Sequence, residues 1–407
     1  MECRFCKTHL EHTVVDLGSS PPSNAYLEKS ELLQPEVYYP LKVKVCHSCW
    51  LVQTLDFAEA KDLFDEKYAY FSSTSSSWLT HGQNFSDMII DEIGLGKASF
   101  VLEVASNDGY LLQNFVEKEI PCLGVEPTLS TARIAEGKGI PVLKEFFSAE
   151  LGSKIALTNK KADLVVGNNV YAHVPDILDF TLGLKNVLQE NGVITLEFPY
   201  LINLLELNQF DTIYHEHYSY LSLGVVEEIF KEVGLRVWRV DHLSTHGGSI
   251  RVYGCHADDP RQTDESVQQL RIKEKSYRLN TLQPYEDLQQ LSTKVKNTFL
   301  TFLLEAQSEG KSVVGFGAAA KGNTLLNFAG VKSDLISKVY DNARGKIGKC
   351  LPGSHIPVED ASKIFHSNPD YVVIFPWNIK TEILGYLSPL KKGGTRFVTF
   401  IPDIEIS

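Results

Sequence analysis

The sequence predicts an α/β protein in which a small N-terminal zinc-binding module precedes two doubly wound domains. Two Cys-x-x-Cys pairs near the start of the chain indicate the metal-binding module. Two separate series of short apolar runs, alternating with helical stretches, indicate two mostly parallel sheets. The length of 407 residues is also too great for one ordinary core. We therefore expect domains at residues 1–60, 61–260 and 261–407, with a helical lead-in over 61–98.

Composition and charge exclude several classes of partner. The chain is 43% hydrophobic and 22% charged, as in a globular protein, and its formal net charge is −12. A negative chain binds nucleic acid and anionic lipid poorly, so we expect a small, locally recognised substrate. The first residues lack the apolar stretch of an export signal, and no run of about eighteen apolar residues occurs, which predicts a cytoplasmic protein. The oligomeric state is left open, and a monomer is compatible with these features.

The N-terminal cysteines have the spacing of a structural zinc site. Two Cys-x-x-Cys pairs separated by a long loop can present four thiolates tetrahedrally, because each pair supplies two sulfurs from one tight turn. The expected ligands are Cys3, Cys6, Cys46 and Cys49. Four protein ligands leave no open position for water, so the zinc should be structural and not catalytic. The alternative is a set of buried or redox-active cysteines.

The central domain has the strand pattern of a class I methyltransferase. Short apolar runs occur at residues 100–104, 122–125, 141–143, 163–166 and 192–196. Two more strands are expected at residues 235–240 and 249–254, and their short connection requires an antiparallel pair. A mostly parallel sheet that closes with an antiparallel hairpin is the usual architecture of class I, S-adenosylmethionine-dependent methyltransferases.

A cofactor site is expected where three of these strands end. Glu103 ends a strand and precedes a small-residue turn, and either Glu103 or Asp108 is expected to meet a cationic amino group. Glu126, at the end of the next strand, is placed to accept both ribose hydroxyls of an adenosine, which favours S-adenosylmethionine over a dinucleotide. The Asn pair that ends the fourth strand is expected near the methionine end, with a plain turn as the alternative. The expected cofactor-binding residues are Glu103, Ser106, Asn107, Asp108, Gly109, Glu126, Pro127, Asn168 and Asn169.

The densest polar cluster is Tyr-His-Glu-His-Tyr-Ser-Tyr at residues 214–220. Such a group is costly to bury without a role. The alternatives are a second metal site, although His-Glu-His lacks the zincin spacing, and a satisfied polar core. A further polar segment at residues 68–73 could close over the mouth of the central domain or be ordinary aromatic packing.

The C-terminal part is expected to be Rossmann-like. Two helices should bridge the domains over residues 264–309, interrupted at Pro284. Strands follow at residues 312–316, 338–340, 371–375 and 396–401. The Gly-Phe-Gly-Ala-Ala-Ala-Lys-Gly-Asn-Thr turn at residues 315–324 follows a strand and opens a helix, so its amides can cradle a pyrophosphate while Lys321 adds charge. A structural domain without ligand is the alternative.

At these residues the sequence resembles the sugar C-methyltransferase family, which includes enzymes that methylate C-3 of nucleotide-linked 4-keto deoxysugars. The similarity spans essentially the whole chain and is carried by residues 16–18, 106–109, 198–200, 210–217, 246–249, 315–318, 321–323, 341–342 and 352–353 together with the paired cysteines. The resemblance implies a zinc-binding N-terminal domain, a central cofactor domain, and a C-terminal domain that helps hold the nucleotide sugar. The active site is then expected between the last two domains. The implied substrate-binding residues are His246, Gly317, Lys321, Asn323, Asp341, Asn342 and Lys346.

The family's catalytic residues fall on Tyr214, Glu216 and His217, and a further tyrosine on Tyr68 or Tyr70. The implied chemistry removes a proton next to a ketone and methylates the resulting enolate, which needs a base, donors for the enolate oxygen and no catalytic metal. His217 is the expected base, because an ordinary imidazole pKa of about 6.5 suits proton abstraction without retuning by burial.

Glu216 is the rival base and is otherwise assigned to orientation or substrate contact, while Tyr214 is the expected donor to the enolate oxygen. Two further alternatives are an NAD-dependent nucleotide-sugar oxidoreductase or epimerase and a non-catalytic nucleotide-sugar binding protein. Neither glycine turn, however, has the complete dinucleotide fingerprint.

Overall fold

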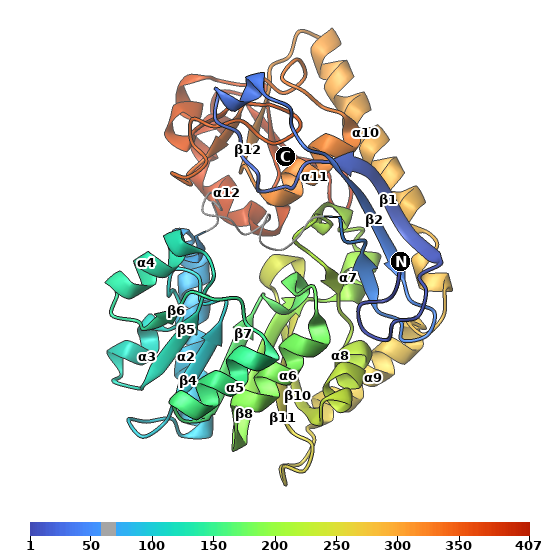
Figure 1. The fold of residues 1–407 in the computed structure, drawn as a ribbon. Helices are drawn as coiled ribbons and strands as arrows, with labels where there is room; N and C mark the ends of the chain where they lie inside the picture. The colour runs from blue at the N-terminus through green and yellow to red at the C-terminus, as the bar shows by residue number, and fades with distance from the viewer. Residues whose placement is uncertain (58–70) are drawn as a thin grey trace.

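The computed structural model describes residues 1–57 and 71–407. Its described residues form a four-stranded, a seven-stranded and a six-stranded sheet. Figure 1 shows the seven-stranded sheet with its helices in the lower part of the molecule, the six-stranded sheet above it, and the N-terminal strands beside both. The predicted boundary between residues 60 and 61 lies outside the described residues, so the three-domain division stays a prediction.

The central sheet has the order β10-β11-β8-β7-β4-β5-β6. Its strands are β4 (Val101–Val104), β5 (Cys122–Val125), β6 (Val142–Leu143), β7 (Ala162–Asn168), β8 (Leu188–Pro199), β10 (Leu235–Leu243) and β11 (Ser249–His256). All pairings are parallel except those of β11 with β8 and β10, which confirms the predicted antiparallel hairpin. Every side chain of β4 is buried, as expected for a strand covered by helices on both faces.

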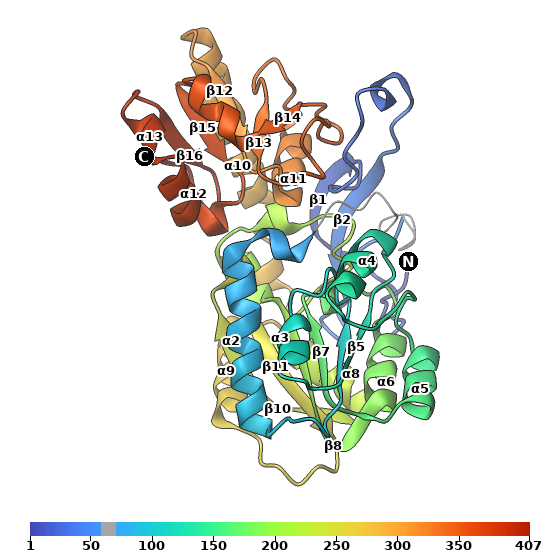
Figure 2. The same cartoon turned by 90° about the vertical axis from the view of Figure 1, so that its left-hand side faces the viewer.

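Helices cover both faces of this sheet. In Figure 2, α2 and α3 lie on one side of the strands and α5 and α6 on the other. The helices of this region are α2 (Ser76–Ile93), α3 (Gln113–Glu117), α4 (Leu129–Gly137), α5 (Ala149–Thr158), α6 (Ile177–Val187), α7 (Leu201–Glu206) and α8 (Leu223–Glu232). The side chain of Ser75 caps α2 by accepting from the Trp78 N–H, and Gly94 ends it in the left-handed conformation. These two caps fix where α2 begins and where it ends.

The N-terminal sheet joins strands that are distant in the sequence. Its order is β1 (His12–Ser20), β2 (Tyr39–Val45), β3 (Val52–Thr54) and β9 (Ser219–Tyr220). Strand β9 forms the end of the polar cluster at residues 214–220, and the Thr54 hydroxyl donates to the backbone carbonyl of His217 at 2.9 Å. The N-terminal module is therefore built onto the loop that carries the expected catalytic residues.

The C-terminal sheet has the order β14-β13-β12-β15-β16-β17 and is parallel except for β17. Its elements are β12 (Val313–Phe316), α11 (Ala320–Ala329), β13 (Val339–Asp341), β14 (Val358–Asp360), β15 (Tyr371–Ile374), α12 (Lys380–Tyr386), α13 (Ser388–Lys391), β16 (Arg396–Thr399) and β17 (Glu405–Ile406). The Rossmann-like expectation is confirmed, and β14 and β17 are additional to the predicted strands.

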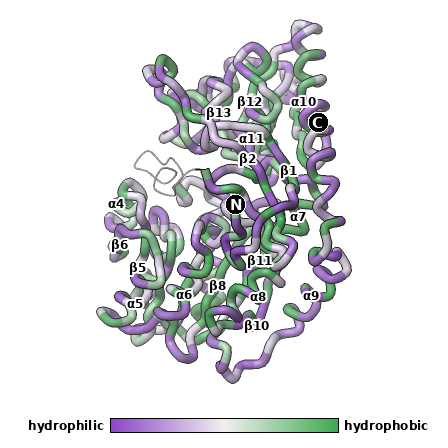
Figure 3. Tube along the Cα trace, turned by 45° about the vertical axis from the view of Figure 1, so that its right-hand side comes forward, coloured by the Kyte–Doolittle hydropathy of each residue, from purple (hydrophilic) through white to green (hydrophobic). Residues whose placement is uncertain are grey.

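Two bridging helices, α9 (Glu265–Tyr277) and α10 (Leu288–Ser308), confirm the predicted pair. Hydrophobic and hydrophilic colours alternate along α10 in Figure 3, and the buried Val295, Phe299 and Leu303 recur on one face. Within the described residues, no helix combines the length and apolar character needed to span a membrane.

Candidate active site

A cavity of about 510 Å³ lies between the central domain and the C-terminal domain. Its walls come from the ends of β4, β5 and β7, from the polar cluster, from the start of α11, and from Asn24 of the N-terminal module. In open α/β sheets, ligands bind at the carboxyl ends of the strands, which is where this cavity opens.

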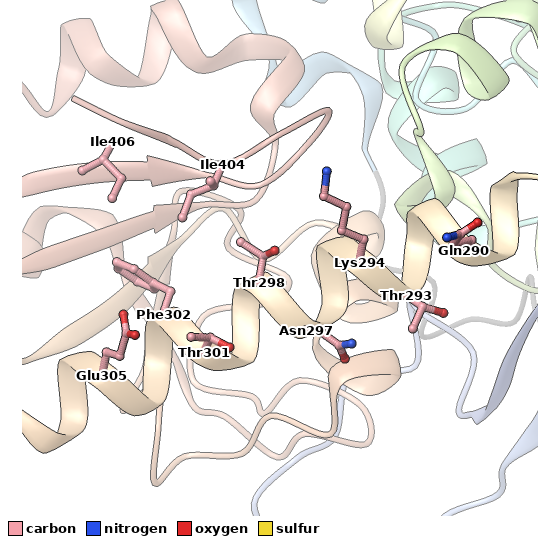
Figure 4. Close-up of a pocket in the computed structure, with 10 residues that line it drawn as sticks. All are labelled: Gln290, Thr293, Lys294, Asn297, Thr298, Thr301, Phe302, Glu305, Ile404 and Ile406. Carbon is pink, nitrogen blue, oxygen red and sulfur yellow. The ribbon is translucent and has the colours of Figure 1, made fainter.

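A second hollow of about 720 Å³ lies along the outer face of α10, next to β17 (Figure 4). Its two charged lining residues, Lys294 and Glu305, are both exposed. Because an active site needs convergent, partly buried polar groups, we place the chemistry in the cavity between the domains and not here.

The cofactor turn after β4 is shaped by the carboxylate of Glu126. Its Oε2 accepts from the Asn107 N–H and its Oε1 from the Thr128 N–H, both at 2.9 Å. Gly109 has φ of +73°, and a Cβ there would lie 2.3 Å from Ile140 Cδ1, so only glycine fits. The Ser72 N–H donates to Asn107 Oδ1 at 2.9 Å, which ties the short 3-10 helix before α2 (Ser72–Thr74) to this turn.

Three buried carboxylates gather behind the turn: Glu103, Asp108 and Glu126. Burial, with the neighbouring charges of Glu126 and Asp108, raises the pKa of Glu103 well above its usual value. Glu103 Oε2 and Asp108 Oδ1 are buried with no hydrogen-bond partner among the described residues. Glu103, Asp108 and Gly109 do not line the cavity, so these two unpaired acceptors lie behind its wall.

The asparagine pair at the end of β7 supplies further polar groups. Asn168 and Asn169 both line the cavity, and both side-chain atoms of Asn168 are buried without a partner in the described part of the chain. Asn169 has φ of +60°, so the strand ends in a tight turn at this point. Unpaired amide groups at the edge of a cavity fit the charged methionine end of the donor. Of the remaining expected cofactor residues, Pro127 lines the cavity, and Ser106 is fully buried behind it.

His217 lies in the wall of the cavity with one ring nitrogen fixed. Its Nδ1 is 2.7 Å from the backbone carbonyl of Thr212. A carbonyl only accepts, so Nδ1 carries the proton and Nε2 keeps its lone pair in the neutral ring. Burial, the neighbouring His173 and His246, and Lys321 lower the pKa of His217 well below its usual value. The sequence-based expectation of an ordinary pKa is therefore wrong, because the ring is desolvated.

The neighbours of His217 define the rest of the cluster. The ring of Tyr214 lies 4.0 Å from that of His217, centroid to centroid, and the ring of His173 lies 4.6 Å away. All three line the cavity. His215 points elsewhere, with Nε2 3.3 Å from the backbone carbonyl of Tyr39. Tyr68 and Tyr70 lie outside the described residues.

Glu216 is buried beside this cluster and does not line the cavity. Its Oε1 accepts hydrogen bonds from the backbone and the side chain of Asn24, at 3.3 and 3.2 Å. Burial raises the pKa of Glu216, and the donors of Asn24 oppose that shift.

Lys321, Lys346 and His246 bring positive or polar groups to the other side of the cavity. Lys321 Nζ donates to Asn378 Oδ1 at 2.7 Å and lies 4.4 Å from the centre of the Trp377 ring. Burial lowers the pKa of Lys321, and Asp211 opposes that shift. His246, Lys321 and Lys346 are therefore the expected substrate residues that the structure brings to the cavity.

The other four expected substrate residues do not line the cavity, and three of them make hydrogen bonds within the protein. The Asn323 amide donates to the Ser23 carbonyl at 2.7 Å, and the two carboxylate oxygens of Asp341 accept from the Ala318 and Ala343 N–H groups, each at 2.6 Å. The Gly317 carbonyl accepts from the Ala319 N–H at 2.8 Å, and Asn342 is exposed. The expected amide cradle is thus wrong for Ala318 and Ala319, because the Ala318 N–H is bonded to Asp341 of β13 and the Ala319 N–H to Gly317 within the turn.

The four N-terminal cysteines converge on one point. Their Sγ atoms all lie within 4.8 Å of one another, and the Cys3–Cys49 and Cys6–Cys46 pairs are 3.5 Å apart. Tetrahedral zinc with Zn–S bonds of about 2.3 Å places its sulfurs roughly 3.8 Å apart, so these residues fit the ion. None of them lines the cavity, as expected for a structural site.

Several cavity residues were missed by the sequence analysis: Asn24, Trp78, Phe146, Phe147 and His173. His173 follows the fourth strand by a few residues, and that position was the available signal. Asn24 lies in a Pro- and Ser-rich turn, which carries no such signal.

Comparison with known proteins accounts for the chain from end to end. It matches the family profiles described as "Putative zinc binding domain" at residues 3–64, "Methyltransferase domain" at 58–240 and "C-methyltransferase C-terminal domain" at 244–402. The C-methyltransferase NovU of Streptomyces niveus is 33% identical over 405 residues, covering 100% of this chain and 96% of the relative. The chain belongs to the C-methyltransferase family. This C-methyltransferase uses S-adenosylmethionine and carries a zinc-binding domain, and we do not retain the NAD-dependent alternative.

Among solved structures, the chain is similar to the magnesium protoporphyrin IX methyltransferase ChlM of Synechocystis PCC 6803 with bound SAM, at 12% identity and a TM-score of 0.36, covering 50% of this chain and 100% of that one. A SAM-dependent methyltransferase from Aquifex aeolicus is 19% identical with a TM-score of 0.33, covering 42% and 88%. The family assignment of the C-methyltransferase rests on the full-length sequence match.

Proposed function

We propose that this C-methyltransferase acts on a nucleotide-linked 4-keto deoxysugar and methylates C-3, the carbon next to the ketone. A saturated carbon is not a nucleophile, so a C-methyltransferase needs a substrate whose carbon can lose a proton. A neighbouring carbonyl provides this, because the electron pair left behind is delocalised onto its oxygen. The substrate class is the one implied by the sequence resemblance. The cavity between the two domains is lined by Glu126 and Asn168 from the central domain and by Lys321 and Lys346 from the C-terminal domain, which supports one ligand on each side.

The observation that carries the proposal is the state of His217. Its Nδ1 proton is held by the Thr212 carbonyl at 2.7 Å, and its lowered pKa keeps the ring neutral near pH 7. The free Nε2 lone pair can then accept a proton in a site that also contains the Tyr214 ring. A neutral imidazole with a fixed tautomer is what a general base requires.

The reaction balances with one base and one donor. The C-3 proton moves to Nε2 of His217, and the C–H electron pair forms an enolate whose oxygen accepts a hydrogen bond from the Tyr214 hydroxyl. S-adenosylmethionine supplies the electrophilic methyl group that the enolate carbon attacks, with S-adenosylhomocysteine as the leaving group. The proton on His217 then returns to solvent. A lowered pKa makes His217 a weaker base, so stabilisation of the enolate oxygen has to carry more of the reaction.

The nucleotide diphosphate is assigned to the C-terminal side of the cavity. Lys321 and Lys346 both line it, and Lys321 stands in the first turn of α11, where the helix dipole also favours an anion. Asp341 Oδ2 lies 4.0 Å from Lys346 Nζ, so the carboxylate compensates part of that lysine's positive charge before a ligand binds. Lys321 is therefore the stronger candidate for the phosphate contact.

The test is methyl transfer and proton exchange with a panel of nucleoside diphosphate-linked 4-keto-6-deoxyhexoses that differ in base. We expect a product heavier by one methyl group with at least one of them. With S-adenosylhomocysteine in place of the donor and D₂O as solvent, wild type should exchange the C-3 proton. His217→Asn should lower turnover by about 10² to 10⁴ and stop exchange while both ligands still bind. Exchange at the wild-type rate in that variant would assign the base to another group.

A further inference from the structure

The N-terminal module reaches the cavity through a short strap, residues 21–27, that follows β1. The strap is fixed to the C-terminal domain on both sides of Asn24. The Ser23 carbonyl accepts from the Asn323 side chain at 2.7 Å, and the Tyr26 hydroxyl donates to the Ala318 carbonyl at 2.5 Å. Ser23, Tyr26 and Asn323 are all buried. Asn24 is thereby held at one place in the cavity wall.

The orientation of the Asn24 side chain is set by Glu216. A carboxylate only accepts hydrogen bonds, so the amide nitrogen has to face Glu216 Oε1, from which it is 3.2 Å away. The Asn24 backbone N–H donates to the same oxygen at 3.3 Å. Glu216 is only 1% exposed and is absent from the cavity lining, whereas Asn24 is part of it. The amide oxygen of Asn24, opposite its nitrogen, is then the atom of this pair that a ligand can reach.

We propose that Asn24 is a substrate-binding residue whose amide oxygen accepts a hydrogen bond from a hydroxyl or amino substituent of the bound sugar. This inference rests on the proposed function, because it takes the occupant of the cavity to be a sugar. Glu216 is then a positioning residue that acts through Asn24. An amide oxygen accepts and cannot donate, so a substrate with a hydroxyl at this point binds better than its deoxy analogue. The N-terminal module thus contributes to substrate selection as well as holding zinc.

The experiment is a double-mutant cycle on kcat/KM with whichever 4-keto sugar nucleotide wild type methylates. Asn24→Ala and Glu216→Gln should each lower kcat/KM by about 10-fold, mainly through KM, the scale for one hydrogen bond. The double variant should be no worse than Asn24→Ala alone, because Glu216 has lost the group through which it acts. Affinity for S-adenosylmethionine should stay at the wild-type value in all three variants.

Ala25→Ser is the matched control, since Ala25 is an exposed strap residue outside the cavity lining, and it should behave as wild type. Zinc content and thermal midpoint establish that each variant is folded, and Asn24→Ser replaces Asn24→Ala if the latter fails these checks. Wild-type kinetics in the Asn24 variants would overturn the inference. So would losses that multiply to about 100-fold in the double variant, which would mean that Glu216 acts independently of Asn24. Failure of the proposed function would look different, because wild type would then methylate no sugar in the panel.

Discussion

Replacing Glu126 with alanine tests the cofactor site most directly. Glu126 is 5% exposed and already accepts two backbone N–H groups, one on each carboxylate oxygen. Each oxygen has a second lone pair, and together these can accept the two ribose hydroxyls of S-adenosylmethionine. Losing hydrogen bonds to a charged group costs about 1.5–3 kcal/mol, which corresponds to a dissociation constant roughly 10- to 200-fold higher. Burial raises the pKa of Glu126, and the hydrogen bonds from Thr128 and Asn107 oppose that shift.

The assay is calorimetric titration of Glu126→Ala with S-adenosylmethionine and with S-adenosylhomocysteine. The dissociation constants of both ligands should rise by the same factor, because both carry the same ribose. Glu136→Ala is the matched control: Glu136 lies on α4, pairs with Lys144 at the surface and does not line the cavity. That variant should bind as wild type. An unchanged dissociation constant in a folded Glu126→Ala protein would refute the assignment and place the ribose elsewhere.

Four further predictions concern the zinc site, the phosphate contact and the buried histidines. Elemental analysis should find one zinc per chain, and Cys46→Ser should lose it together with thermal stability, because the first sixty residues lack the core to fold alone; freshly purified protein without zinc would contradict this. Lys321→Ala should raise KM for the sugar nucleotide and spare affinity for S-adenosylmethionine, whereas equal losses would indicate misfolding. Burial lowers the pKa of His173 and His246 to about 4, so ¹⁵N spectra of labelled histidine should show both rings neutral at pH 6. Because the base works only when neutral and the pKa of His217 is lowered, kcat/KM should stay level as pH falls through 6.5 and decline only below it; a break at 6.5 would argue against this environment.

Most parallel strands of both doubly wound domains were predictable because helices cover them on both faces, whereas the three-residue edge strand β14 was not. The covered strands are continuous apolar runs, and Val101–Val104 is an example in which every side chain is buried. The N-terminal sheet was not predictable in this way. Its last strand, β9, comes from Ser219–Tyr220, far along the chain from β3, and a pairing of that range leaves no local pattern.

Site residues were predictable where they stand at the carboxyl ends of the parallel strands. Glu126 and Asn168 line the cavity because the carboxyl ends of parallel strands meet at one edge. Asn323 and Asp341 also follow strands, but the Asn323 amide nitrogen bonds to Ser23 and the Asp341 carboxylate to Ala318 and Ala343. Sequence spacing shows which residues are near a ligand site, and it does not show which of their polar atoms are already paired.

One of the groups that lower the pKa of His217, the ammonium of Lys321, also bears on the proposed reaction. In the proposed reaction, proton transfer from a neutral C–H bond to the neutral His217 ring creates an imidazolium and an enolate together. The positive charge of Lys321 disfavours the imidazolium and favours the enolate, so its net effect depends on which of the two lies closer. Lys321 is also tied to Asn378 and the Trp377 ring, and Trp377 in turn donates to Asp211 at 2.7 Å. Because these contacts fix the ammonium before substrate arrives, Lys321 needs little reorganisation to meet the diphosphate that the proposed function assigns to it.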